Sequence, residues 1–191
     1  LTSEDLRGKF VLYSFTYTNC PPPCGDVDTT MQAVQERLDE VELYGNEVEF
    51  VTISVDPERD TPETLAARAA ELGAGDTWRF ATTDNELLLK DIVGGGFRTF
   101  YEKRDDGTFI LDPGFVLVDG YGIIRNEYRY QTISPDVDRI VRHLGGLGRH
   151  PIFPKAVEDP GEGSNAEQQQ EDENRPHGSS QEADRGLVDR R

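Results

Sequence analysis

The sequence predicts an α/β domain in which helices cover both faces of a mixed central sheet, a three-layer sandwich. Apolar runs typical of buried strands alternate with amphipathic helical segments over the first half of the chain. Crossover helices of this kind place successive strands parallel. Two strand-like segments then flank a short glycine-containing turn near residue 120, and such a hairpin adds antiparallel strands to the sheet.

The first strand is predicted at residues 9–16, where an apolar, aromatic-rich run is typical of a buried central strand. The chain's only two cysteines, Cys20 and Cys24, follow it, and an amphipathic helical pattern begins immediately after them. A helix N-terminus favours the thiolate form of a nearby cysteine, so this position predicts a functional dithiol. The alternative is a structural disulfide, which would close a very small loop and add little stability.

Three prolines separate the two cysteines and limit how they can meet. Proline has no backbone N–H, so residues 21–23 cannot donate a hydrogen bond to the Cys20 thiolate. Continuous polyproline II would hold the two Cα atoms roughly 12 Å apart, whereas a disulfide requires less than about 7 Å. We therefore expect the spacer to turn, at Pro23 where the chain enters the helix, so that Cys20 and Cys24 can bridge.

The helix after the cysteines is predicted from apolar residues at alternating spacings of four and three. These residues form one helical face: Val27, Met31, Val34, Leu38 and Val41. Asp26 and Asp28 suit the first turn of this helix, and Gly45 suits its C-terminal cap.

A second strand is predicted at residues 47–55, where the pattern alternates and then becomes fully apolar. Thr61 is the expected N-cap of the next helix, with Pro62 at its first helical position. This helix should run to about Leu72, and a short strand should follow at residues 78–81.

The third helix is predicted at residues 85–93, capped by Asp84 and ended by the glycines at residues 94–96. Extended segments at residues 97–103 and 108–111 flank an Asp-Asp-Gly turn.

The terminal hairpin is predicted from residues 115–118 and 123–130, followed by a last helix at residues 135–144. Ser134 should cap this helix, and the glycine pair after it should close it. With a dithiol at the end of the first central strand, this order of elements is thioredoxin-like.

The chain's 191 residues allow one folded domain, predicted at residues 1–150, and a disordered acidic tail at residues 151–191. A net charge of -17 argues against nucleic acid or an anionic membrane as a ligand. An acidic surface with few lysines suits a high-salt environment, and the alternative is an ordinary acidic protein kept soluble by its charge. We find no apolar run long enough to span a bilayer and no signal peptide, so a membrane anchor would have to precede Leu1.

The loop after the second strand contains Asp56, Arg59 and Asp60, near the expected cysteine end of the sheet. These residues have two possible roles: a functional one, or a loop-ordering ion pair together with a helix cap. Tyr17 and Trp78 are expected in the core.

Three segments resemble the Sco/SenC family: residues 8–12 (GKFVL), residues 15–21 (FTYTNCP) with Cys24, and residues 54–63 (SVDPERDTPE). The resemblance covers about residues 1–144, and the third segment is long and specific. It implies an extracytoplasmic thioredoxin fold that is anchored to the membrane. It also implies delivery of copper to the binuclear copper centre of cytochrome c oxidase, or reduction of the cysteines of that oxidase subunit.

In the resembled family, two cysteines, here Cys20 and Cys24, hold copper together with a histidine of an Asp-His motif before a late strand. The corresponding stretch at residues 109–118 contains Asp112 but no histidine. We expect the chain's own histidines to be solvated surface residues rather than a relocated ligand: His143, His150 and His177.

Pro113 resembles the cis-proline that reductases of the thioredoxin fold place opposite their cysteines. We expect a cis peptide bond between Asp112 and Pro113, with the proline ring packed near Cys20 and Cys24 and shaping the site. Two thiolates without the family histidine should hold copper(I) but bind copper(II) poorly.

Three functional hypotheses remain. The first is a Sco-like extracytoplasmic dithiol protein in which Cys20 attacks and Cys24 resolves, with the oxidase subunit that carries the binuclear copper site as partner. The second is a general TlpA-like thiol–disulfide oxidoreductase that acts on another dithiol protein without copper. The third is a binding module that has kept the fold and lost both chemistries.

Overall fold

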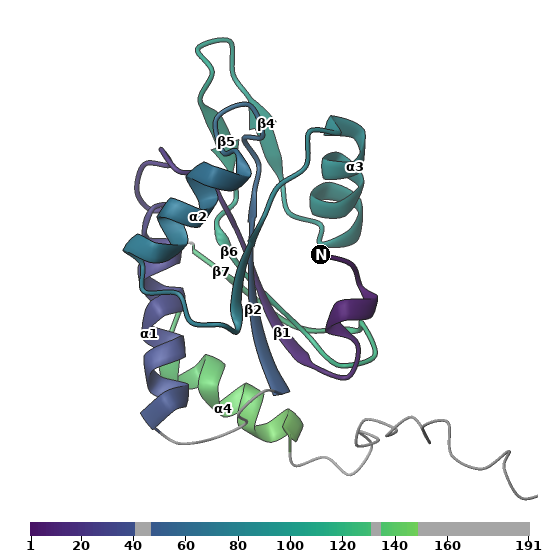
Figure 1. The fold of residues 1–191 in the computed structure, drawn as a ribbon. Coiled ribbons are helices and arrows are strands. Elements are labelled where there is room, and N and C mark those ends of the chain that lie inside the picture. The colour runs from purple at the N-terminus through teal and green to yellow at the C-terminus, as the bar shows by residue number, and fades with distance from the viewer. Residues whose placement is uncertain (41–46, 131–134, 149–191) are drawn as a thin grey trace, which may run out of the picture. The chain divides into compact units, whose positions relative to one another are not determined.

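A computed structural model shows a five-stranded sheet with helices on both faces (Figure 1). It describes residues 1–40, 47–130 and 135–148. The strand order is β3-β2-β1-β6-β7, which places β1 (Phe10–Thr16) at the centre. β2 (Val48–Ser54) runs parallel to β1, and β3 (Trp78–Ala81) runs parallel to β2. β6 (Gly114–Val118) is antiparallel to β1 and forms a hairpin with β7 (Ile124–Arg129). The predicted mixed sheet is confirmed, and the arrangement is the expected thioredoxin-like sandwich.

One face of the sheet is covered by α1 (Asp26–Glu40) and α4 (Val137–Gly148), with α2 (Pro62–Glu71) beside α1 (Figure 1). The predicted apolar face of α1 is buried against the sheet and against α4: Val27, Met31, Val34 and Leu38. Thr61 caps α2 as predicted, because its side chain accepts the backbone N–H of Thr64. Trp78 lies in this core, as expected.

The opposite face is covered by α3 (Glu86–Lys90), which continues into the π-helical segment η3 (Asp91–Gly96), and by the short η1 (Glu4–Leu6) (Figure 1). β4 (Tyr101–Lys103) and β5 (Phe109–Leu111) form a separate antiparallel hairpin. Leu89 and Val93 anchor the α3–η3 segment in the second core.

Two predicted boundaries around α3 are wrong. Asn85 rather than Asp84 caps the helix, and its side chain accepts the Leu88 N–H at 3.1 Å. The three glycines do not end the helix but form η3, where the Phe97 N–H donates to the Ile92 carbonyl at 3.0 Å. Val93 is fully buried, so tertiary packing holds this segment helical in spite of the glycines.

The predicted end of α4 is also wrong, because the helix runs through Gly145 and Gly146. Ile140 and Leu144 are fully buried against α1 and the sheet, and this burial outweighs a glycine cost of about 1 kcal/mol. Val41, Gly45 and Ser134, and the predicted acidic tail at residues 151–191, lie outside the described residues. Within the described ranges, no helix is both long and apolar enough to cross a membrane.

Candidate functional site

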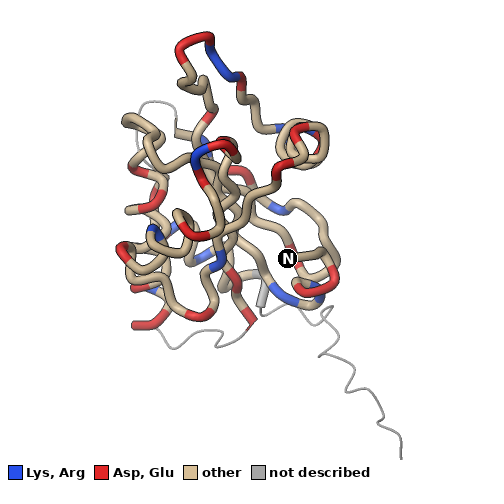
Figure 2. The backbone as a smooth tube through the Cα atoms, turned by 45° about the horizontal axis from the view of Figure 1, so that its top comes forward, with Lys and Arg blue, Asp and Glu red and all other residues tan. Residues whose placement is uncertain are grey.

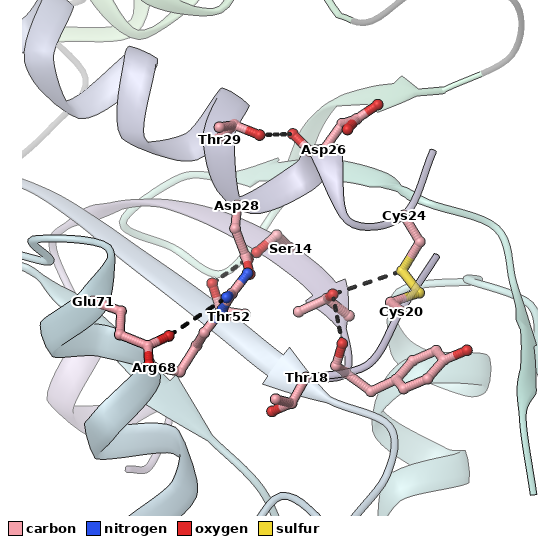
Figure 3. A network of polar contacts seen from close by, with 12 residues as sticks. Ser14, Thr18, Cys20, Cys24, Asp26, Asp28, Thr29, Thr52, Arg68 and Glu71 are labelled. Carbon is pink, nitrogen blue, oxygen red and sulfur yellow. Dashed lines mark hydrogen bonds and ion pairs between the residues drawn. A yellow bond between two sulfur atoms is a disulfide. The ribbon is translucent and has the colours of Figure 1, made fainter. Parts of the chain in front are cut away.

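Cys20 and Cys24 form a disulfide between the end of β1 and the start of α1 (Figure 3). Their Cα atoms lie 5.6 Å apart, so the proline spacer turns, as expected. The Cys24 N–H donates to the Pro21 carbonyl at 3.0 Å, and the Asp26 N–H donates to the Pro23 carbonyl at 3.1 Å. The turn therefore leads directly into the first turn of α1.

The two sulfur-bearing residues differ in exposure. Cys24 is 5% exposed and belongs to the apolar core between the sheet and α3, whereas Cys20 is half-buried at the margin of this core. Gly25 permits their close packing, because a Cβ at that position would lie 2.9 Å from the Cys20 carbonyl oxygen. Cys20 is therefore the more exposed of the two cysteines.

Thr16, the last residue of β1, lies directly against the disulfide. Its Oγ1 is 3.6 Å from Cys24 Sγ, within the range of a hydrogen bond to sulfur. Sequence reasoning missed this contact. The available signal was the position of a hydroxyl residue at the end of the strand that leads to the cysteines.

Asp60 fixes the segment that precedes Cys20. Its Oδ2 accepts the backbone N–H of Thr18 at 3.0 Å and the hydroxyl of Ser54 at 2.5 Å. The Asp60 side chain is almost fully buried. Because β1 and β2 are parallel and in register, their following loops meet at one edge, and Asp60 joins them there.

Asp56 and Arg59 form the loop-ordering ion pair that was one of the two expected roles, with Arg59 Nε 2.5 Å from Asp56 Oδ2. Arg59 also donates to the carbonyl of Gly107, in the turn of the β4–β5 hairpin. Tyr17, which is buried as expected, contacts the same hairpin through its ring against that of Phe109. The hairpin is thus joined to both loops at the cysteine end of the sheet.

A buried ion pair joins α1 to α2 (Figure 3). Asp28 Oδ2 accepts Arg68 Nη2 at 2.9 Å and Nε at 3.2 Å, and Asp28 is 4% exposed. Burial raises the pKa of Asp28 above its ordinary value, against the opposing effect of Arg68, and the negative charge of Asp60 adds to the rise. No local sequence pattern predicts this pair, because its members lie 40 residues apart.

The expected cis bond between Asp112 and Pro113 is wrong: the cis peptide in the described part of the chain joins Pro22 and Pro23. The Asp112 N–H donates to the Phe100 carbonyl, and the Pro113 carbonyl accepts the Tyr130 N–H, both at 3.0 Å. Backbone hydrogen bonds to other segments therefore hold the chain on both sides of this bond. Pro113 is buried directly before β6, and its site-shaping role remains a prediction.

The residues in the stretch that resembles the Asp-His region of the family have other partners. Asp112 is ion-paired with Arg129, and Leu111 packs against the apolar core that contains Cys24. His143 lies on α4, where its Nδ1 is 2.8 Å from the Tyr128 hydroxyl, and His150 and His177 lie outside the described residues. In the described ranges, no group of three or more His, Cys, Asp and Glu side chains is arranged to hold a metal ion.

Comparison with known proteins places these features in a family context. The SCO1/SenC family model matches residues 1–145. The SCO1 protein homolog of Bacillus subtilis is 28% identical over 139 residues, which cover 72% of this chain and 70% of the relative. The mitochondrial SCO1 homolog of Homo sapiens is 27% identical over 119 residues, and the match spans 61% of this chain but only 38% of the human protein.

Solved structures show the same fold. A SCO1/SenC family lipoprotein from Bacillus anthracis superposes with a TM-score of 0.69 at 27% identity, covering 78% of this chain and 86% of the other. BsSco, a member of the Sco family of cytochrome c oxidase assembly proteins in which a disulfide switch has been identified, superposes with a TM-score of 0.65 at 26% identity. That match covers 76% of this chain and 84% of BsSco.

Proposed function

Because the chain belongs to the SCO1/SenC family, we propose that it serves cytochrome c oxidase assembly through the dithiol of Cys20 and Cys24. One observation carries the proposal: the two cysteines bridge at the end of the central strand, with Cys20 accessible and Cys24 buried. The relatives support it, since BsSco is described as an oxidase assembly protein with a disulfide switch. The proposed partner is the oxidase subunit that carries the binuclear copper site.

The exposures of the two cysteines support distinct chemical roles. Cys20 exchanges with the partner, because it is the half-buried sulfur at the margin of the core, and Cys24 resolves from its buried position. Reduced protein transfers its two electrons to a disulfide of the partner and becomes the bridged form.

Copper enters this proposal as cargo that the reduced dithiol would hold. Cys20 and Cys24 supply two soft sulfur ligands, which suit copper(I). The third position of the family site is poor in donors here, because Leu111 is apolar and the Asp112 carboxylate is paired with Arg129. We therefore propose that the protein holds copper(I) through two thiolates and copper(II) only weakly.

The same observation favours a second candidate, a TlpA-like thiol–disulfide oxidoreductase that uses Cys20 and Cys24 without copper. This candidate predicts disulfide exchange with a range of dithiol proteins and no copper(I) complex of physiological strength. A binding module that has lost both chemistries predicts neither exchange nor copper binding.

Titration of the reduced protein with copper(I) and copper(II) separates these candidates, with Cys20→Ser and Cys24→Ser as controls. We expect one copper(I) bound per protein, loss of binding in both controls, and weak copper(II) binding. Thiol quantification after exposure to an oxidised dithiol peptide tests exchange in parallel. Exchange without copper(I) binding would favour the oxidoreductase, and absence of both would favour the binding module.

The variant Leu111→His tests whether the scaffold can rebuild the family site. Leu111 is a better position than Asp112, because Asp112→His would also remove the ion pair to Arg129. Leu111→His should strengthen copper(II) binding and add a nitrogen ligand to the electron paramagnetic resonance spectrum. A nitrogen-ligated, tightly held copper(II) in the unmodified protein would contradict the two-thiolate proposal.

The proposed location is extracytoplasmic, with attachment to a membrane through a segment outside the described residues. The Bacillus anthracis neighbour is described as a lipoprotein, which supports this proposal.

A further inference from the structure

Thr16 places a hydroxyl group against the sulfur that leaves when the disulfide opens. Its Oγ1 lies 3.6 Å from Cys24 Sγ and 3.5 Å from the carbonyl oxygen of Tyr17. Both Thr16 and Cys24 are buried, at 7% and 5% exposed. The hydroxyl therefore has two acceptors within reach, and one of them changes charge during disulfide exchange.

The central strand holds this hydroxyl in position. Thr16 pairs in register with Ser54 of β2, and the Thr16 carbonyl accepts the Val55 N–H at 3.0 Å. The position of the hydroxyl thus depends on the β1–β2 ladder rather than on the proline spacer. A donor fixed before the reaction needs no reorganisation when charge develops on the sulfur.

Cys24 needs such a donor because its surroundings are apolar. It belongs to a buried cluster of mostly apolar side chains that also includes Phe15, Val55 and Val93. Burial of this kind disfavours a charged sulfur relative to a neutral one. A hydrogen bond to a charged acceptor is stronger than one to a neutral acceptor, so a hydroxyl that bonds weakly to the disulfide bonds more strongly to the thiolate.

We propose that Thr16 is a catalytic hydroxyl that donates a hydrogen bond to the Cys24 thiolate as the disulfide opens. A thiolate of a dithiol partner attacks Cys20 Sγ, the bond between Cys20 and Cys24 breaks, and its electron pair leaves on Cys24. The second thiolate of the partner then attacks the partner's own sulfur in the mixed disulfide and releases the Cys20 thiolate. Two electrons pass to this protein, the partner becomes a disulfide, and the two protons lost by the partner thiols are available to Cys20 and Cys24.

This inference rests on the dithiol exchange of the proposed function, and depends neither on copper nor on an oxidase subunit. The test uses the full chain in its oxidised form and dithiothreitol as the dithiol. Thr16→Val removes the hydroxyl at nearly constant volume, and Thr16→Ser retains it. We expect Thr16→Val to slow disulfide opening and lower the equilibrium constant for reduction, each by about three- to tenfold, the factor that one hydrogen bond represents. Thr16→Ser should restore both values.

Thr52→Val is the matched control, because Thr52 is also buried but its hydroxyl bonds to Ser14 and to Trp78. Thr52→Val should change thermal stability. It should leave the rate of disulfide opening and the equilibrium constant for reduction unchanged. If Thr16→Val does not fold, Thr16→Ala removes the same hydroxyl and gives the same readout. Redox values equal to the wild type in the folded variant, or equal losses in Thr16→Val and Thr16→Ser, would overturn the assignment. A wild-type disulfide that dithiothreitol does not open would instead refute the proposed function.

Discussion

Asp60 shows how a single buried side chain determines the geometry of the dithiol. One oxygen of its carboxylate bonds to the backbone of Thr18 and to the hydroxyl of Ser54. The first contact lies two residues before Cys20, and the second lies at the end of the neighbouring strand. Asp60 therefore helps to set the position of Cys20 relative to the sheet. It does so through Thr18 and Ser54, and none of its described hydrogen bonds is to sulfur.

Replacement of Asp60 by alanine should destabilise the fold and loosen the site. The Thr18 N–H and the Ser54 hydroxyl would lose their buried acceptor, which costs about 1–3 kcal/mol in the free energy of unfolding. Urea denaturation measures this loss. Dithiothreitol should also reduce the disulfide faster, because the segment before Cys20 is no longer held.

Glu58→Ala is the control for this change, since Glu58 lies in the same loop but is exposed and pairs with Lys103 at the surface. The midpoint of its urea denaturation should equal that of the wild type. If Asp60→Ala behaved like Glu58→Ala in both assays, Asp60 would not hold the cysteine segment.

At the scale of elements, Gly114 and Gly95 differ in whether the structure has room for a larger side chain. The neighbouring sequence does not predict this difference. At Gly114 in β6, an added Cβ would lie 2.4 Å from the Tyr128 carbonyl oxygen of β7. At Gly95 in η3, it would meet nothing within 4 Å, and φ is not positive there. Gly114 therefore permits the close approach of β6 and β7, whereas a side chain at Gly95 would extend into open space.

Gly114→Ala should therefore destabilise the protein, whereas Gly95→Ala should leave it unchanged or stabilise it by about 0.4–1 kcal/mol, because alanine restricts the unfolded chain. A backbone clash in a paired strand has no flexible side chain to relieve it, so we expect a loss of about 1–3 kcal/mol for Gly114→Ala. Thermal denaturation followed by circular dichroism compares the two. A stable Gly114→Ala variant would show that β7 can shift away from β6 at little cost.

The elements that the sequence predicted well are those whose signals are local. The buried face of α1 follows from the spacing of Val27, Met31 and Val34, and the start of α2 follows from the cap of Thr61 and the proline after it. The η3 segment and the length of α4 could not be predicted, because glycine lowers helix propensity and only tertiary packing restores the helix.

The candidate site also combines features that the local sequence predicts with features that it does not. The bridge between Cys20 and Cys24 followed from the expectation that the three-proline spacer turns where the strand gives way to the helix. The contacts of Asp60 with Thr18 and of Asp28 with Arg68 could not be predicted, because they join residues 42 and 40 positions apart in the chain. Pairing across such distances is determined by strand register and helix packing, which no local pattern records.

At the scale of the whole molecule, the acidic residues of the described ranges lie on helices, loops and hairpins alike (Figure 2). The net charge is -17, and acidic residues outnumber basic ones both before and after residue 150. Several acids are nevertheless buried in ion pairs, such as Glu49 with Lys9 and Arg79. Salt screens exposed charges much more than such buried pairs, so added salt should mainly weaken the repulsion among surface carboxylates.

The melting temperature at neutral pH should therefore climb steadily with molar potassium chloride, because screening removes self-repulsion that opposes the compact state. Measurement near pH 4.5, close to the isoelectric point of the sequence, provides the control. There the net charge is small, so the same salt series should raise the melting temperature much less. If the curves at both pH values rose equally, potassium chloride would be acting through general exclusion from the protein surface rather than through charge. A flat response at neutral pH would mean that the acidic surface gives no stability in high salt, and would remove the prediction of a high-salt environment.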